Sequence, residues 1–391
     1  MATSLPLPAH SAPVAAGIAK SRVASIPWYI WCAVFAATSA MVGAHWDISW
    51  HRSIGRDTFW TPAHIAIYLC GVLAGISCGY LILSRSFGFS DDLATVKVWG
   101  FRAPLGAFLA SWGGIAMLTS APFDNWWHDA YGLDVKIVSP PHVLLISGSA
   151  MVMMGALLLT LGHMNRATGA AYRRLNAIFL YLGAMCIVLL GILLLEFNVK
   201  VLQHTAGFYQ RLSLAIPFLL AGVARASGIR WATTIVAGIY TLFIYGCIWI
   251  LPLFPAEPKL GPVYIPVTHF IPPDCPPLFL VPAFLLDLLW QRTEHWNKWK
   301  LAVISGVLFT GVLLAVQWPF ASFLLSEHSK NWIFGTHYMG YYQHPQSFTF
   351  RRVFVPAEPD FLPILGSAFL FSILSMRAGF TWGDWMRTIK R

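Results

Sequence analysis

The stretch of sequence that decides the fold lies at residues 175–197 and reads LNAIFLYLGAMCIVLLGILLLEF. It carries a single charged residue, Glu196. A helix needs about 20 mostly apolar residues to cross the hydrocarbon core of a bilayer. This stretch therefore predicts a transmembrane helix.

The whole chain has the same apolar character. Of its 391 residues, 57% are hydrophobic and 11% are charged, whereas soluble globular proteins carry about 25% charged residues. So few charges cannot cover a water-facing surface of this size, and the composition also excludes disordered, collagen-like and coiled-coil classes. Because Trp and Tyr collect at membrane interfaces, the 18 Trp residues fit a membrane protein. We expect an all-α polytopic transmembrane helix bundle.

Ten segments are predicted to span the membrane, at residues 25–46, 63–84, 103–121, 140–162, 175–197, 211–227, 231–254, 276–291, 301–324 and 361–378. The sixth and eighth are short for a full crossing and are candidates for re-entrant segments. Residues 1–24, rich in Ala, Pro and Ser, are expected to form a flexible tail. The remainder divides into residues 25–165, which contain the motifs described below, and residues 166–391, an additional transmembrane region.

Lys and Arg predict the orientation through the positive-inside rule. With a cytoplasmic N-terminus, 17 of the 26 Lys and Arg residues fall on the inner side, which also places the C-terminus inside. Ten of the 13 histidines and 11 of the 16 acidic residues then fall on the outer side. The cations are scattered among apolar runs, so the net charge of +10 does not indicate nucleic-acid binding. The six cysteines form no CxxC pair and are interpreted as small core residues.

Signal-peptide cleavage near Val42-Gly43-Ala44 would make His45 an N-terminal residue that binds a metal through its amine and its ring. That position is too late for an ordinary signal peptide, so we expect no cleavage. His45 remains an additional ligand candidate.

An internal repeat places acids and histidines at two helix junctions. The residues Asp47, Trp50, His51, Gly55, Asp57, Pro62 and His64 recur as Asp124, Trp127, His128, Gly132, Asp134, Pro140 and His142. In each copy the first acid and the first His are four residues apart, so they share a helix face. Thr61 and Ser139 are predicted N-caps with Pro at the first helical position, which puts the last His on the first turn of the next helix.

Each copy therefore offers two imidazoles and one carboxylate from adjacent helix ends. Such a set suits a first-row transition metal with open positions, and zinc, iron, manganese and copper all remain open. Asp57 and Asp134 are candidates for acceptors that orient an imidazole, although Asp57 could instead pair with Arg56. The alternative is that these residues only cap helices at the interface. Two matching triplets at a membrane boundary favour the metal site, because ionisable residues there are costly and usually functional.

At these residues the sequence resembles the C subunit of the copper-containing membrane monooxygenases, the family of particulate methane monooxygenase and ammonia monooxygenase. One copper site of that family corresponds to Asp47, His51 and His64, and the surrounding Trp50, Arg56, Asp57, Thr58, Thr61 and Pro62 also match. The second site corresponds to Asp124, His128 and His142, with Asp124 replacing the family's Asn. The resemblance covers about residues 25–165.

The resemblance implies two copper sites, a quinol as the reductant, and a trimeric assembly with A- and B-type subunits. It places the metal motifs at the outer, periplasmic face of an inner membrane. We therefore expect a subunit of a copper-dependent membrane monooxygenase that activates O2 to hydroxylate a small apolar substrate. The alternatives are membrane copper binding or transport, and a non-catalytic assembly subunit.

Residues 166–391 add a few further candidates. A Pro-rich outer loop at 255–277 contains His269 and Asp274, which could face the same outer pocket. The loop at 326–360 contains His337 among other histidines and tyrosines. We weigh a lid or a third metal site there against an aromatic loop seated at the membrane interface. Asp287, inside the eighth predicted span, is interpreted as a buried polar contact rather than a proton relay.

Overall fold

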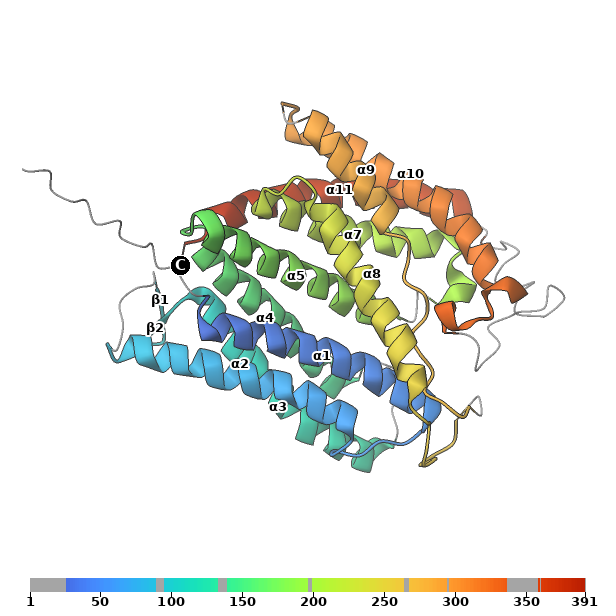
Figure 1. Ribbon diagram of the computed structural model, residues 1–391, viewed down its shortest axis with the longest axis horizontal. Helices are drawn as coiled ribbons and strands as arrows, with labels where there is room; N and C mark the ends of the chain where they lie inside the picture. Colours follow the sequence, from blue (N-terminus) through green and yellow to red (C-terminus); the bar gives the residue numbers. More distant parts are fainter. Residues whose placement is uncertain are drawn as a thin grey trace, which may run out of the picture.

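The computed structural model describes residues 26–88, 95–132, 139–195, 199–263, 267–293, 295–335, 358 and 360–390. Over these residues the chain is an all-α bundle with one small β-hairpin (Figure 1). Eight of its helices are long and apolar enough to cross a membrane. The expected fold class is confirmed.

The elements follow one another as α1 (Trp28–Ser53), α2 (Pro62–Ser86), β1 (Val96–Val98), β2 (Phe101–Ala103), α3 (Leu105–Tyr131), α4 (Pro140–Met164), α5 (Gly169–Leu193), η1 (Lys200–Leu202), α7 (Ala206–Ser227), α8 (Ala232–Ile250), η2 (Leu251–Leu253), α9 (Leu280–Arg292), α10 (Lys298–Leu324), η3 (Glu327–Ser329), η4 (Trp332–Phe334) and α11 (Phe361–Thr388). The η elements are single 3₁₀ turns.

Two of the ten predicted spans differ from this result. Helix α1 is 26 residues long but is not among the eight apolar spans, because Trp, Tyr and His lower its hydropathy. Helix α9 has 13 residues and is therefore about 20 Å long, too short to cross a bilayer. The prediction of a helix from residue 276 is wrong, because the prolines of Pro276-Pro277 keep the chain extended until Phe279.

The motif-bearing helices α1–α4 lie together along one side of the bundle, and α9 and α10 form the opposite edge (Figure 1). Helix α5 packs against α1, α4, α7 and α8, and the buried core is continuous from Ile30 to Met386. Residues 25–165 and 166–391 thus share one hydrophobic core.

Glycines bring α3 and α4 into close contact. A Cβ on Gly113 would lie 2.6 Å from the carbonyl oxygen of Gly148, and a Cβ on Gly106 would lie 2.5 Å from that of Gly155. Helices α2 and α3 meet in the same way at Gly71 and Gly114. Small residues at these positions let backbones approach within a membrane. The two motif-bearing hairpins are therefore held side by side.

The end of the bundle opposite the motifs is tied together by the second half of the chain. Asn165, just after α4, donates hydrogen bonds to the carbonyl oxygens of Met386 and Ile389, at 2.9 and 2.7 Å. The hydroxyl of Tyr172, near the start of α5, donates to the carbonyl of Ser227 at 2.9 Å. The ends of α4, α7 and α11 thus meet here, whereas the two motifs lie at the other ends of α1–α4.

Candidate metal centre

The first motif lies where α1 ends and α2 begins. Asp47 and His51 are on the last two turns of α1, and His64 is the third residue of α2. Thr61 is the N-cap and Pro62 the first helical residue, as predicted. The Thr61 hydroxyl accepts a hydrogen bond from the Thr58 amide at 2.8 Å, so it fixes the loop before the helix.

These elements bring four ligand side chains together. One ligand atom from each of Asp47, His51, Asp57 and His64 lies within 4.8 Å of every other. The Nε2 of His64 is 3.1 Å from Oδ1 of Asp47 and 2.9 Å from Oδ2 of Asp57. The Nε2 of His51 is 3.7 Å from Oδ2 of Asp47 and 3.3 Å from Oδ2 of Asp57. We call these four residues the first cluster.

The position of Asp57 differs from the prediction. The sequence suggested an acceptor that orients an imidazole from behind, or a partner of Arg56. In the structure Asp57 faces the same Nε2 atoms as Asp47, and its side chain is only 8% exposed. Among the described residues no ion pair joins it to Arg56. Asp57 therefore lies among the candidate ligands, where it contacts both imidazoles.

The spacing of these atoms fits a metal ion. Ligand bonds of about 2.0–2.2 Å at tetrahedral or octahedral angles put neighbouring ligand atoms about 3.0–3.6 Å apart. The observed nitrogen–oxygen distances, from 2.9 to 3.7 Å, match this range. Oδ1 of Asp47 is also buried without a hydrogen-bond donor, a costly arrangement that a cation would relieve. Two nitrogens and two carboxylates suit copper(II), zinc, iron or manganese.

The electrostatics of the first cluster show strong coupling between acids and imidazoles. Burial by itself lowers the pKa of His51, but the hydrogen bond to Asp57 and the charges of Asp47 and Asp57 raise it to about 9. Burial alone raises the pKa of Asp57, yet the hydrogen bonds and charges of the two histidines hold it well below its usual range. Without a metal, a proton on the imidazole takes over part of the cation's role.

The second motif repeats this geometry between α3 and α4. The Nε2 of His128 is 3.5 Å from Oδ2 of Asp124, and the Nε2 of His142 is 3.6 Å from Oδ1 of the same carboxylate. Ser139 caps α4, its hydroxyl accepting from the His142 amide at 3.4 Å. Oδ1 of Asp124 is buried without a hydrogen-bond donor. Asp134 lies outside the described residues. We call Asp124, His128 and His142 the second cluster.

The two clusters open onto one small cavity of about 50 Å³. Asp57 and His64 line it from one side, Asp124 and His128 from the other, and Tyr68 lies beside them. The shared cavity was not predictable from the repeat, because it depends on how α2 and α3 pack. Tyr68 was also missed, although it follows His64 by four residues and so had to share its helix face.

The Pro-rich loop of the second half braces the first cluster. The Ser49 hydroxyl donates to the Ile271 carbonyl at 2.5 Å, and the Ser53 hydroxyl accepts from the Ile271 amide at 2.7 Å. Gly55 contacts Gly261 so closely that a Cβ on Gly55 would lie 2.8 Å from the Gly261 carbonyl. This loop therefore fixes the end of α1, which carries Asp47 and His51.

The additional candidates lie away from the clusters. His45 is buried on α1, with its Nδ1 at 2.9 Å from the Met41 carbonyl, and it shares a small cavity with Asp274. Asp274 acts on Lys200 instead: burial lowers the pKa of Lys200 to about 8, and the charge of Asp274 opposes that shift. His269 contacts the Thr268 hydroxyl. His337 lies outside the described residues.

No family model matches the chain, and no curated protein or solved structure matches it either. The resemblance to copper monooxygenases therefore rests on the motif residues alone.

Proposed function

We propose that the chain is the metal-holding subunit of a membrane-bound, copper-dependent monooxygenase that hydroxylates a small apolar substrate. The observation that carries the proposal is the first cluster, with four ligand atoms within 4.8 Å of one another beside a second cluster on a shared cavity. The spacing of Asp47, His51 and His64, and of Asp124, His128 and His142, adds the family resemblance.

The residues of the chain have separate roles in this proposal. His51 and His64 would hold one copper through their Nε2 atoms, with Asp47 and Asp57 as charge-balancing ligands. Asp124, His128 and His142 would hold the second. Bound copper would supply the one-electron chemistry that O2 activation requires. Each imidazole must give up its proton to solvent when it binds the metal, so metal binding would release protons.

The shared cavity supports a small substrate. Its volume of about 50 Å³ exceeds the roughly 10–15 Å³ that one water molecule needs. Phe59 lines it, and the Tyr68 ring lies 5.2 Å from the Phe59 ring. The rest of the lining is mostly polar and includes Arg56, Asn125 and Asp129. A molecule of a few heavy atoms that arrives through the bilayer would therefore have to displace water beside the clusters.

By the same resemblance we propose a quinol as the electron donor and a trimeric assembly with A- and B-type subunits. The clusters would face the periplasm. The Lys- and Arg-rich ends of the helices, at the other end of the bundle, would then lie in the cytoplasm, which agrees with the positive-inside rule.

The test is metal analysis and EPR on the purified protein, with His51→Ala and His128→Ala variants. We expect each substitution to remove about one copper per chain and the matching part of the copper(II) signal. His269→Ala, which changes a histidine outside both clusters, is the control and keeps full metal content. Unchanged metal in both cluster variants would disprove the metal sites.

A second set of measurements tests the identity of the metal and the oxygen chemistry. Stoichiometric zinc without an EPR signal, and no quinol-dependent oxygen uptake by the assembled complex, would disprove the monooxygenase and leave a metal-binding protein. Metal movement across vesicles without oxygen uptake would indicate transport. The position of both clusters at helix ends, rather than at the midplane of the bundle, argues against transport.

A further inference from the structure

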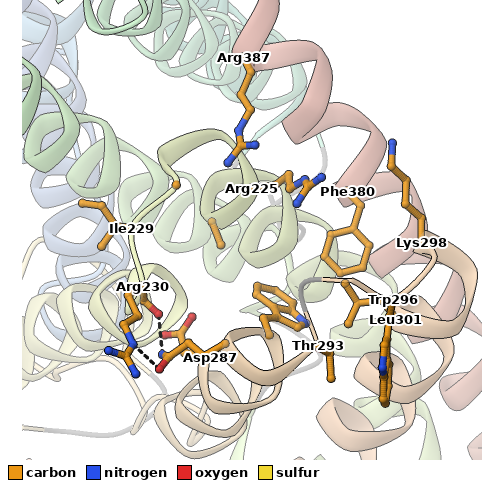
Figure 2. Close-up of a pocket in the computed structure, with 14 residues that line it drawn as sticks. Arg225, Ile229, Arg230, Asp287, Thr293, Trp296, Lys298, Leu301, Phe380 and Arg387 are labelled. Atoms are coloured by element: carbon orange, nitrogen blue, oxygen red, sulfur yellow. Dashed lines mark hydrogen bonds between the residues drawn. The ribbon is translucent and has the colours of Figure 1, made fainter. Parts of the chain in front are cut away.

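A second polar site lies at the end of the bundle opposite the clusters. It is a cavity of about 500 Å³ between the ends of α7, α9 and α11 and the starts of α8 and α10 (Figure 2). Its lining includes four cationic side chains, Arg225, Arg230, Lys298 and Arg387, and a single carboxylate, Asp287. This cavity is ten times larger than the one between the clusters.

The carboxylate does not neutralise these cations. Oδ2 of Asp287 accepts from the Thr234 amide at 2.8 Å and from the Thr234 hydroxyl at 2.7 Å, and Oδ1 accepts from the Thr233 amide at 3.3 Å. These are orphan donors at the start of α8, and a carboxylate there balances the positive helix end. The predicted interpretation of Asp287 as a buried polar contact fits this geometry.

Only two of the four cations have a carboxylate partner among the described residues. Asp384 bridges Arg225 and Lys298, with nitrogen–oxygen distances of 2.6 Å to each. Arg230 binds the neutral amide oxygen of Gln291 through its Nε. Arg387 has no ion pair in the described part of the chain, and its guanidinium extends from α11 into the opening (Figure 2). Neither Arg230 nor Arg387 is therefore neutralised by a carboxylate in the described part of the chain, and Figure 2 shows them on different sides of the cavity.

The surroundings indicate which anion would fit. Guanidinium groups form charge-assisted, forked hydrogen bonds with phosphate oxygens. The indole nitrogen of Trp290, which also lines the cavity, donates to Ser305 at 2.8 Å, and this bond holds the ring in the wall. Trp side chains are typical of the headgroup level of a bilayer, and basic pockets between transmembrane helices bind lipid phosphates.

We propose that this cavity binds a phosphate group through Arg230 and Arg387, carried by an anionic lipid headgroup or by free phosphate. Asp384 pairs with Arg225 and Lys298 at the edge of the cavity, and Asp287 accepts hydrogen bonds from the start of α8. The site is independent of the metal clusters.

The test uses the full-length protein in nanodiscs of phosphatidylcholine, with or without phosphatidylglycerol, and native mass spectrometry to count retained lipids. We expect the wild type to retain phosphatidylglycerol at least about tenfold better than phosphatidylcholine, because both lipids carry a phosphate but only phosphatidylcholine also carries a cationic choline, which the arginines repel. The Arg230→Gln and Arg387→Gln variants should lose that preference. Arg174→Gln, an exposed arginine near the start of α5, should keep it.

A second arm separates the two sources of phosphate. Inorganic phosphate is titrated into detergent-solubilised protein, and the melting temperature is followed. A rise that depends on Arg230 and Arg387, without lipid preference, assigns the site to free phosphate. Lipid preference without such a rise assigns it to a headgroup.

Folding is controlled by the conservative variant Arg387→Lys, which should retain part of the binding, and by metal content at the distant clusters. If the Gln variants keep wild-type metal content and wild-type binding of both probes, the proposal is overturned. In that case Arg387 only balances the C-terminal end of α7, where it lies 3.4 Å from a Cβ position on Gly228.

Discussion

The two clusters come from one repeated sequence, yet they differ in how closely their described side chains approach one another. The first has four ligands, with Asp57 brought in from the loop after α1, and its end of α1 is held by the Pro-rich loop. The second has three ligands among the described residues, and its two nitrogen–oxygen distances are 3.5 and 3.6 Å. The same spacing therefore sets up both clusters, and the Pro-rich loop, which lies outside the repeat, braces the end of α1 at the first.

The largest effect should come from removing the fourth candidate ligand of the first cluster. Asp57→Ala takes away one direct ligand and a buried negative charge, so we expect metal affinity at the first cluster to fall by about 100-fold or more. The second cluster should change far less. Metal titration followed by EPR measures both. Asp129→Ala is the matched control, because Asp129 lines the shared cavity but belongs to neither cluster.

The effect of pH on metal affinity at the first cluster should be nearly as large as that of Asp57→Ala. A protonated imidazole cannot bind a metal, and the pKa of His51 is raised from 6.5 to about 9 in the metal-free protein. Metal affinity should therefore rise with pH from pH 7, because each imidazole of the cluster must lose its proton, and the part of this rise due to His51, about tenfold per pH unit, should end near pH 9. In the metal-free protein the His51 ion pairs stabilise the fold fully below pH 6.5, and this contribution is lost as the pH rises through 9. A pH-independent affinity would contradict the assignment of His51 as a ligand.

Asp124→Asn sharpens the comparison at the second cluster. The substitution introduces the Asn that the copper monooxygenases have at the matching motif position, and it removes one negative charge. We expect affinity for a divalent metal there to fall by about tenfold, because the ligand loses its charge but keeps an oxygen donor. The first cluster keeps its affinity. Competition titrations against a chelator measure the two sites separately.

Removing a hydrogen bond between the Pro-rich loop and the end of α1 should have the smallest effect on metal affinity. Ser53→Ala leaves the Ile271 amide without its acceptor at 2.7 Å, which costs about 1–3 kcal/mol locally. Most of this cost loosens the loop, so metal affinity at the first cluster should fall by only about two- to fivefold. Hydrogen exchange at residues 267–273 should rise, while the second cluster stays unaffected. Equal losses at both clusters would show that the brace acts on the whole bundle.

Much of this arrangement was predictable from local sequence. The four-residue spacing of Asp47 and His51, and the Thr61-Pro62 helix start before His64, fixed the first triplet because both depend on neighbouring residues alone. The ligand role of Asp57 was not predictable, since a loop residue can point toward Arg56 or toward the imidazoles. The shared cavity depends on contacts between residues about 60 to 70 positions apart, and the brace by Ile271 on contacts across more than 200 positions. The start of α9 was missed because an apolar count does not register that Pro276-Pro277 interrupts a helix.

The shortness of α9 has a consequence for biosynthesis. A helix of 13 residues preceded by a proline-rich extended chain cannot enter a bilayer alone, because its leading backbone groups would lack partners there. In the folded chain the Leu278 amide finds its acceptor in Gln317 of α10, at 2.8 Å. Helix α9 therefore cannot reach its final position before α10 has been synthesised. We expect the two helices to enter the membrane together.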